Sequence, residues 1–383
     1  MKSLKLQLYA FGFLLLCNSL LQPTVVRAQH RKFEKIQKYM DEATSDKLAG
    51  VVISIRSKKF GKWIGTSGYS NLEKKTPIEK ETIFSLASIG KTYTAVAVLQ
   101  LVEAGKIGLD DKIKNYLPKE IIDGFPNAEK VTVRHLLGHT SGLYNYNRNP
   151  ELNELYLSGQ LKLDTLSHMD ALRRYAYGKT EYTKPLGTYR YSSTNYLLLT
   201  MIMDAVLPEG HEAYLRKNVL AKFGFINTYY KQTPPNNLVN HYGDINKDGV
   251  IENLSRETIE TTNWYSGDDG IYAPIEEATA FLEKLVREKE MLNEKTYKQM
   301  TTWNDEKHPD YGLGLMADKG FPYKFLMGHS GRGIGITTDL YYFPEQDMTV
   351  AIFCNTGLRA ASKEFGSAYY KMRNKIMKRL FLF

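Results

Sequence analysis

A serine and a lysine three residues apart, Ser88 and Lys91, stand at the start of the apolar stretch SLASIGKTYTAVAVLQ. On an α-helix, residues i and i+3 project from one face, about 4.5 Å apart along the axis. Burial of that face penalises a charged amine. A neutral lysine can accept the serine proton, which activates the serine as a nucleophile. Serine is also a good helix N-cap, so a cap followed by a surface lysine is the competing interpretation.

Two later stretches contain further groups suited to this chemistry. Tyr191 opens a Tyr-Ser-Ser triplet before the apolar run TNYLLLTMIMDAV. His329, Ser330 and Gly331 stand in the glycine-rich segment MGHSGRGIG, where we expect a strand to begin.

With these three elements in chain order, the sequence resembles the serine β-lactamase and penicillin-binding-protein superfamily, in its class C-like hydrolase and esterase branch. Ser-x-x-Lys is the first catalytic element of that superfamily; the second is Tyr-x-Asn and the third Lys-Thr-Gly or His-x-Gly. The segments GLDDKIKNYLP (108–118), HLLGHTSGL (135–143) and GDDGIYAPIEEATAFLEKL (267–285) resemble further parts of this branch. The likeness therefore covers about residues 45–360.

The resemblance implies a role for each matching residue. Ser88 would be the acylated nucleophile, Lys91 its proton acceptor, and Tyr191 a relay of protons to the leaving group. The backbone N–H groups of Ser88 and Arg332 would form an oxyanion hole, which stabilises a tetrahedral intermediate.

The same likeness places His329 and Ser330 on a strand that lines the site. Gly331 would permit close approach of the substrate backbone, where a side chain would obstruct it.

Two positions depart from the pattern of the superfamily. Ser193 stands where the second element carries asparagine, and a hydroxyl reaches less far than an amide. His329 replaces the lysine of Lys-Thr-Gly, which weakens the fixed positive charge offered to a β-lactam or a C-terminal carboxylate; Arg332 is a candidate for supplying that charge. These departures count more against efficient β-lactam hydrolysis than against the fold.

The surrounding pattern indicates an α+β fold with an antiparallel sheet flanked by helices, of the β-lactamase/transpeptidase type. VVISIR and KWIGTSGY read as strands near one end of the chain, and GIGITTDLYYFP and DMTVAIFCNTG as strands near the other. Residues 88–104 read as a buried helix stopped by Gly105, because apolar residues surround it. We expect one domain over 29–383, with a mostly helical region at about 106–265 inserted between the sheet segments.

The first 28 residues read as a secretory signal peptide. Lys2 and Lys5 precede an apolar run, and Val26-Arg27-Ala28 offers a cleavage site. We therefore expect export to the periplasm or outside the cell, with a lipoprotein through Cys17 disfavoured by Leu16 before it. Removal of this segment takes away three basic residues and no acidic one, so the net charge falls from +9 to +6.

The rest of the composition limits the partners. Cys354 would be the single cysteine of the mature chain, in an apolar run that predicts a buried thiol. Basic residues are dispersed, except near the C-terminus, where apolar residues at helical spacing predict a docked helix. The expected partner is a small-molecule or peptide substrate. We expect no nucleic acid, no cofactor and no transmembrane span in the mature chain; the oligomeric state is not defined by the sequence.

Two metal patterns were weighed. His135 and His139 have zinc-ligand spacing, but the Glu of His-Glu-x-x-His is absent. Asp244, Asn246, Asp248 and Glu252 match part of an EF-hand loop. Ser255 occupies the twelfth position, where a bidentate Glu belongs, so a weak calcium site and an Asx-rich turn are both open.

The sequence thus predicts an exported serine hydrolase that cleaves esters or amides, including D-amino-acid peptides and, less readily, β-lactams. A non-catalytic sensor or binding protein on the same fold is the alternative.

Overall fold

The central element of the computed structural model is an eight-stranded antiparallel sheet in the order β3-β2-β1-β13-β12-β11-β10-β9. The structure describes residues 31–158, 160, 162–180, 186–303, 310–320, 322–359 and 361–382. The expected signal peptide, including Cys17, lies outside these residues. The strands of this sheet are β1 (Gly50–Ser57), β2 (Gly61–Asn71), β3 (Thr76–Pro77), β9 (Asp310–Tyr311), β10 (Met316–Asp318), β11 (Leu326–Arg332), β12 (Thr337–Phe343) and β13 (Met348–Cys354).

The sheet joins segments from the two ends of the sequence. Strand β1 pairs with β13, with Val51 opposite Cys354 and Ser57 opposite Met348. Because side chains alternate across a strand, Val51, Ile53 and Ile55 face one core, whereas Val52 faces another. The expected α+β class with a sheet built from distant segments is therefore confirmed.

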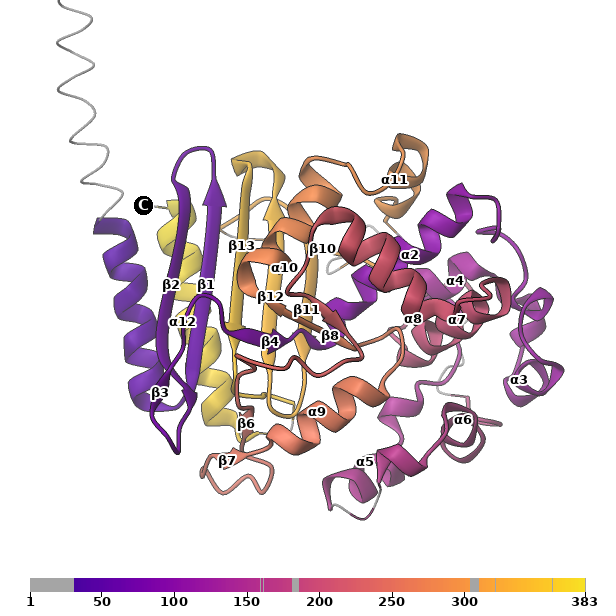
Figure 1. The fold of residues 1–383 in the computed structure, drawn as a ribbon, viewed down its shortest axis with the longest axis horizontal. Coiled ribbons are helices and arrows are strands. Elements are labelled where there is room, and N and C mark those ends of the chain that lie inside the picture. The colour runs from indigo at the N-terminus through magenta and orange to yellow at the C-terminus, as the bar shows by residue number, and fades with distance from the viewer. Residues whose placement is uncertain are drawn as a thin grey trace, which may run out of the picture.

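One face of the sheet is covered by a pair of helices, one spanning residues 31–46 and the other α12 (Lys363–Leu382) (Figure 1). The side of α12 predicted to dock is buried, from Phe365 through Tyr369 and Met372 to Leu380. Cys354 is fully buried in the same core, and burial raises the pKa of its thiol to about 12. The predictions of a docked terminal helix and a buried thiol are confirmed.

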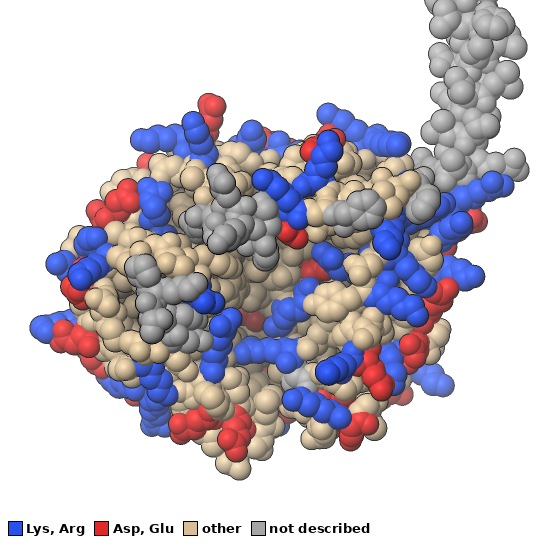
Figure 2. Space-filling view, turned by 180° about the vertical axis from the view of Figure 1, so that it is seen from behind, with Lys and Arg blue, Asp and Glu red and all other residues tan. Residues whose placement is uncertain are grey.

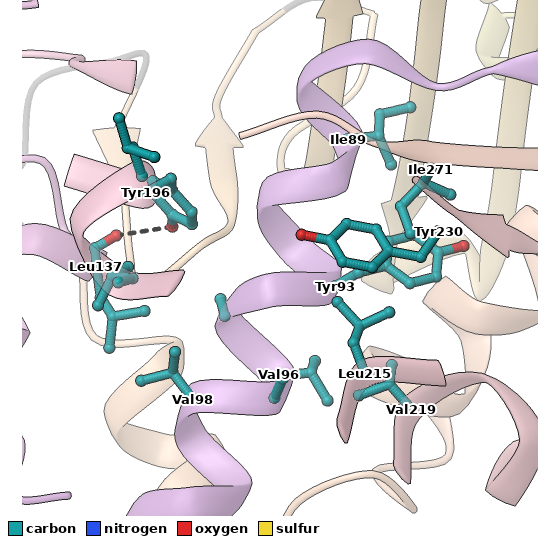
Figure 3. Close-up of a cluster of buried hydrophobic side chains, with 14 of the residues drawn as sticks. Ile89, Tyr93, Val96, Val98, Leu137, Tyr196, Leu215, Val219, Tyr230 and Ile271 are labelled. Carbon is teal, nitrogen blue, oxygen red and sulfur yellow. Dashed lines mark hydrogen bonds between the residues drawn. The ribbon is translucent and has the colours of Figure 1, made fainter. Parts of the chain in front are cut away.

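The other face carries the larger core, built around α2 (Gly90–Glu103). Figure 3 shows Ile89, Tyr93 and Val96 of this segment directed toward Ile271, Tyr230 and Leu215, with Val98 on the opposite side toward Leu137. The helix is thus enclosed by apolar side chains on several sides, as its composition predicts. It ends as expected before Gly105, whose φ of +69° favours glycine.

Helices dominate the chain between β4 (Ile83–Ser85) and the second half of the sheet. They are α3 (Lys119–Gly124), α4 (Val133–Leu137), α5 (Pro150–Leu157), α6 (His168–Tyr175), α7 (Ser193–Val206), α8 (Gly210–Leu215), α9 (Ser255–Trp264), α10 (Ile275–Leu282) and α11 (Glu294–Met300). Four short strands accompany them: β5 (Tyr229–Tyr230), β6 (Tyr242–Gly243), β7 (Glu252–Asn253) and β8 (Ile271–Pro274). Strands β4, β8 and β5 form a small second sheet beside α2.

The expectation that a strand begins at His329 is wrong. Strand β11 runs from Leu326 and ends at Arg332, and β12 begins only at Thr337. A turn separates them, closed by the Gly333 N–H donating to the Ile336 carbonyl at 2.9 Å. Of the glycine-rich run, Gly333 and Gly335 therefore stand in a hairpin turn, whereas Gly328 and Gly331 lie inside β11.

Basic and acidic side chains are interspersed over the face seen in Figure 2, without a continuous basic stripe. A search of the described helices finds none with the length and apolarity needed to cross a membrane.

Candidate active site

Ser88 lies on a tight 3-10 turn, Ala87–Ile89, that leads directly into α2. Neither this turn nor α2 has a side-chain N-cap, so Ser88 is not a helix cap. Ala87, the residue before it, has a φ of +47°, a left-handed conformation that costs free energy for a residue with a Cβ. Ser88 is partly exposed between buried neighbours. The strained turn thus presents one hydroxyl to solvent.

Lys91 lies one turn further along and is completely buried. Its Nζ donates to Ser88 Oγ at 3.2 Å and to the Asp268 carbonyl oxygen at 2.9 Å. It also lies 5.0 Å from the centroid of the Tyr191 ring and 5.7 Å from that of Tyr196. The interpretation of Lys91 as a surface lysine is therefore wrong, and its amine is directed at the serine.

Tyr191 precedes α7 and packs against His139, with ring centroids 4.2 Å apart. His139 Nδ1 accepts hydrogen bonds from the Ser192 N–H and from Asn195 Nδ2, both at 3.2 Å. Burial, together with the Lys91 charge, holds the pKa of His139 well below its usual range. A neutral His139 therefore fixes the segment that carries Tyr191 without adding a charge. His135 lies apart, bonded to Thr132 in a capping box, so the two histidines do not form a zinc pair.

Strand β11 divides the third element between two sides. Ser330 and Arg332 line a pocket, whereas His329 is directed toward Tyr311 and Gly331 faces the turn that carries Ser88. This follows from the two-residue alternation of side chains along a strand. Strand β11 lines the site as predicted, and the buried His329 ring lies beside Tyr191, with ring centroids 6.3 Å apart, rather than at the pocket surface.

His329 is buried, and both of its ring nitrogens are occupied. Nδ1 lies 2.7 Å from the Ser330 carbonyl oxygen, so it donates there, and Nε2 then accepts from the Tyr311 hydroxyl at 3.1 Å. Burial and the Lys91 charge lower the pKa of His329 to about 3. This histidine therefore supplies no positive charge to a substrate.

A glycine is required at position 331 because the backbone there packs closely against the turn that precedes Ser88, not against a substrate. A Cβ at this position would lie 2.3 Å from the Leu86 carbonyl oxygen and 2.9 Å from Ala87 Cβ. The glycine thus allows β11 to approach the turn that carries Ser88, and the predicted role in substrate approach is corrected. The same packing brings the 330–332 backbone beside the nucleophile, where the oxyanion hole was predicted.

The pocket above Ser88 has a volume of about 450 Å³. Its lining residues are polar or aromatic at most positions: Ser88, Asn145, Asn147, Arg148, Tyr189, Tyr191, Ser193, Met316, Ser330, Arg332 and Arg359. Three arginines line it, and none of the described lining residues is an aspartate or a glutamate. Arg332 donates to Asp339 Oδ1 at 2.7 Å, and Asp339 is shared with Arg373, so two guanidinium groups divide one carboxylate. The pocket wall is therefore positively charged.

Several functional residues were missed by sequence reasoning. Asn145 accepts the Ser193 N–H on Oδ1 at 3.2 Å, and Asp268 accepts from Lys91 through its carbonyl oxygen. Both lie inside or beside stretches already recognised, HTSGLYN and GDDG, but outside the three catalytic elements. The two consecutive aspartates between glycines in GDDG (267–270) are the sequence feature from which a role for Asp268 could have been predicted.

Of the two interpretations left open for residues 244–252, the hydrogen bonds fit the Asx-rich turn. Asp244 accepts backbone N–H groups of Asp248, Gly249 and Ser362, and Asn246 donates to Glu252 Oε1 at 2.6 Å. These bonds are those of an Asx-type turn. Among the described residues, no group of three or more His, Cys, Asp or Glu side chains converges on a metal position.

A buried lysine in contact with a serine, held between an antiparallel sheet and an all-α region, defines the class of β-lactamase-type serine hydrolases. The family model described as Beta-lactamase matches residues 34–370, and the chain belongs to that family.

Curated relatives and solved structures agree with this assignment. Penicillin-binding protein 4* of Bacillus subtilis (strain 168) is 24% identical over 331 residues, which cover 81% of this chain and 68% of the relative. The D-amino acid amidase of Ochrobactrum anthropi SV3, complexed with D-phenylalanine, superimposes with a TM-score of 0.75 at 19% identity and covers 91% of this chain and 99% of the amidase. A D-stereospecific amidohydrolase from Streptomyces sp. gives a TM-score of 0.73 at 22% identity, with coverage of 87% and 97%. At these identities the solved structures establish the fold.

Proposed function

We propose that the protein is a serine hydrolase that forms an acyl-enzyme on Ser88. The observation that carries the proposal is the 3.2 Å contact between Lys91 Nζ and Ser88 Oγ at the base of an open pocket. A base within hydrogen-bond distance of a hydroxyl is the geometry that nucleophilic catalysis requires.

The chemistry uses groups already in place. Ser88 Oγ attacks the carbonyl carbon of the substrate while its proton passes to the Lys91 amine. The oxyanion forms near the 330–332 backbone and is stabilised by N–H donors there. The proton then reaches the leaving group, with Tyr191 as the relay, and an alcohol or amine departs. Water attacks the ester on Ser88 in the reverse sense and releases the acid.

The substrates proposed are esters, or amides such as D-amino-acid peptides, with an anionic group. Arg148, Arg332 and Arg359 support the anionic group, because guanidinium groups bind carboxylates strongly. The D-amino acid amidase and D-stereospecific amidohydrolase folds are consistent with a D-residue beside the scissile bond. β-Lactams come second, because Ser193 and the neutral His329 replace an amide and a cation.

A fluorescent fluorophosphonate tests the mechanism. We expect it to label Ser88, and Ser88→Ala to lose labelling and to reduce hydrolysis by a factor of about 10⁴ or more, since the nucleophile is removed. Nitrophenyl esters, D-Ala peptides and a chromogenic cephalosporin, compared in one panel, define the substrate class. Unlabelled wild type together with unchanged hydrolysis in Ser88→Ala contradicts the proposal.

A second candidate is a non-catalytic sensor or binding protein on this fold. It is favoured by one observation, the absence of charge on the buried His329. Intact-mass analysis separates the two: a penicillin adduct that persists for hours without product supports the sensor, and ester or peptide turnover excludes it.

Export is part of the proposal and rests on the leader-like residues 1–28. N-terminal sequencing of the protein purified from its source should find Gln29 first. A mature chain that retains Lys2 and Lys5 contradicts export by cleavage.

A further inference from the structure

Asp268 holds Lys91 with two different groups. Its carbonyl oxygen accepts from Lys91 Nζ at 2.9 Å, and its carboxylate oxygen Oδ2 lies 3.8 Å from the same nitrogen. The Asp268 side chain is 3% exposed and that of Lys91 is 0% exposed. Among the described residues, Asp268 is the acid that forms an ion pair with this lysine. The Asp268 carboxyl group therefore lies at ion-pair distance from the proposed base.

The turn that carries Asp268 is fixed by glycines. Gly267 has a φ of +77°, and a Cβ there would lie 2.4 Å from the Tyr196 carbonyl oxygen. A Cβ on Gly90, in the first turn of α2, would lie 2.7 Å from the Asp269 carbonyl oxygen. The turn thus packs backbone to backbone against both α2 and α7. The position of the acid is set by the same elements that position Ser88 and Lys91.

The Asp268 carboxyl group is incompletely satisfied. Oδ1 is buried and has no hydrogen-bond partner among the described residues. A structural carboxylate is normally bonded at both oxygens. Burial raises the pKa of Asp268, and the Lys91 charge and then the Ser193 side chain oppose that rise. Ser193 lines the same pocket as Ser88. Ser193 stands at the asparagine position of the second catalytic element and acts on the acid.

We propose that Asp268 is the positioning residue for Lys91, and that Ser193 and Asp268 together replace the missing asparagine. The proposal rests on the proposed acyl-enzyme function of Ser88. During acylation, a proton leaves Ser88 Oγ for Lys91 Nζ as the bond from Oγ to the carbonyl carbon forms. The Asp268 carboxylate stabilises the ammonium that results, and the Asp268 carbonyl keeps the amine directed at Oγ. The proton then leaves on the departing alcohol or amine, so Lys91 returns to the neutral amine beside the Asp268 carboxylate.

Other charged and titratable groups surround this pair. Those that act on Lys91 or Asp268 are His139, Tyr146, Tyr191, Tyr196, Tyr230, Lys231, Tyr265, Asp269, His329 and Arg359. Burial lowers the pKa of both histidines and raises the pKa of Tyr146, Tyr196, Tyr230 and Tyr265, so these six groups stay neutral near pH 7. Asp269 is the exception, because burial and the Asp268 charge raise its pKa to about 7. A separate variant must therefore account for Asp269.

Asp268→Asn tests the proposal, because it keeps the shape and the backbone carbonyl but removes the charge. The measurement is the rate of Ser88 labelling by a fluorophosphonate, together with kcat and KM for a nitrophenyl ester, from pH 5 to 10. We expect kcat and the labelling rate to fall roughly 10- to 100-fold, with KM within about twofold. The acidic limb of the pH profile should lie at lower pH in Asp268→Asn than in the wild type, since an opposite charge beside an amine favours the ammonium and its removal disfavours it.

Two control variants distinguish a charge effect from a fold effect. Asp244→Asn removes another buried carboxylate, one that does not line the pocket, and should leave the profile in place. Asp269→Asn removes the group that titrates near pH 7 and should move the acidic limb less than Asp268→Asn does. If Asp268→Asn retains the wild-type rate and limb position, the proposal is overturned. It is also overturned if Asp268→Asn loses rate equally at every pH.

Ser193→Ala provides a second test if Asp268→Asn does not fold. Loss of the hydroxyl should reduce kcat severalfold. The decline of kcat on the acidic side of the pH profile should begin at higher pH, because the Asp268 carboxylate loses a group that lowers its pKa. In the Asp268→Asn background, Ser193→Ala should reduce kcat little further, since the effects of two substitutions are not additive when one residue acts through the other. A full additional loss in that background overturns the link between Ser193 and Asp268.

The outcome is separable from that of the proposed function. If the wild type is not labelled at Ser88, the acyl-enzyme itself is wrong. If the wild type is labelled and Asp268→Asn is labelled equally fast across the pH range, the acyl-enzyme stands and the role of Asp268 is wrong.

Discussion

Two buried aspartates, Asp339 and Asp268, each lie beside a cation, but their surroundings differ. Asp339 accepts from Arg332 on Oδ1 at 2.7 Å, and from Tyr369 and Arg373 on Oδ2 at 3.0 and 2.8 Å. Asp268 has one ion-pair partner and a buried oxygen without a hydrogen bond among the described residues.

The difference distinguishes an aspartate that stabilises the fold from one that we propose takes part in catalysis. A buried ion pair contributes to a stable fold when its remaining lone pairs are satisfied. Asp339 meets that condition, and its partners join β12 to α12 and to the pocket wall. Asp268 does not meet it, because one of its buried oxygens has no hydrogen-bond partner among the described residues. Proteins retain such unsatisfied polar groups mainly at functional sites. The comparison predicts that stability depends on Asp339 and the rate on Asp268.

The largest expected effect on stability comes from Asp339→Ala. Two partly buried guanidinium groups would then lose their carboxylate, which costs about 3 kcal/mol. Urea denaturation followed by circular dichroism should show this loss, whereas Asp268→Asn should lose much less. Equal losses in the two variants would remove the distinction between the two acids.

Acid should destabilise the protein through its buried histidines. Burial lowers the pKa of His241 to about 3, and that of His329 also to about 3. The unfolded chain binds these protons below about pH 6.5 while the folded protein does not, so stability falls as pH drops through 6.5. The expected loss at pH 5 is about 2 kcal/mol for each histidine.

His241→Leu tests this dependence away from the pocket, because both ring nitrogens of His241 lack partners among the described residues. The variant should lose the contribution of one histidine to the slope of unfolding free energy against pH between 6.5 and 5. A slope equal to that of the wild type contradicts the assignment.

The smallest effect is expected at Asp269 and has the opposite sign. Its pKa is about 7 in the folded protein, above the ordinary value of 3.8. The folded protein therefore binds a proton that the unfolded chain has released, and this contribution is lost as pH rises through 7. Asp269→Asn should gain about 1–2 kcal/mol relative to the wild type between pH 5 and 8, since partial exposure screens the charge. Thermal unfolding at both pH values measures it; a constant difference contradicts the prediction.

Much of the fold follows from local pattern. The alternation in VVISIR, the apolar run after Ser193 and the helical spacing before Leu380 each correspond to an observed element. The Ser88 and Lys91 pair follows from a short motif whose meaning depends on Tyr191 and on the β11 segment far along the chain. Their convergence could be inferred from the order of the three elements, and the structure brings them together.

The sequence could not predict toward which neighbours some side chains of the site are directed. The side of β11 on which His329 lies depends on where the strand ends, and the glycines hid that boundary. The contact of Asp268 with Lys91 depends on a turn that has no periodic pattern. A charged residue in such a turn looks like ordinary solvent-exposed sequence until the packing of α2 and α7 against it is known.

The pairing of β1 with β13 means that the central sheet can form only after the C-terminal part of the chain has been synthesised. Residues 50–57 are made early in synthesis but find their neighbour only at residues 348–354. Until then β1 has β2 on one side and an unpaired edge on the other, and such edges promote association between chains. Folding that depends on contacts this distant is slow. A ribosome that stalls before residue 348 would therefore release a chain that exposes the centre of its own sheet, which makes truncated products candidates for aggregation and for proteolysis.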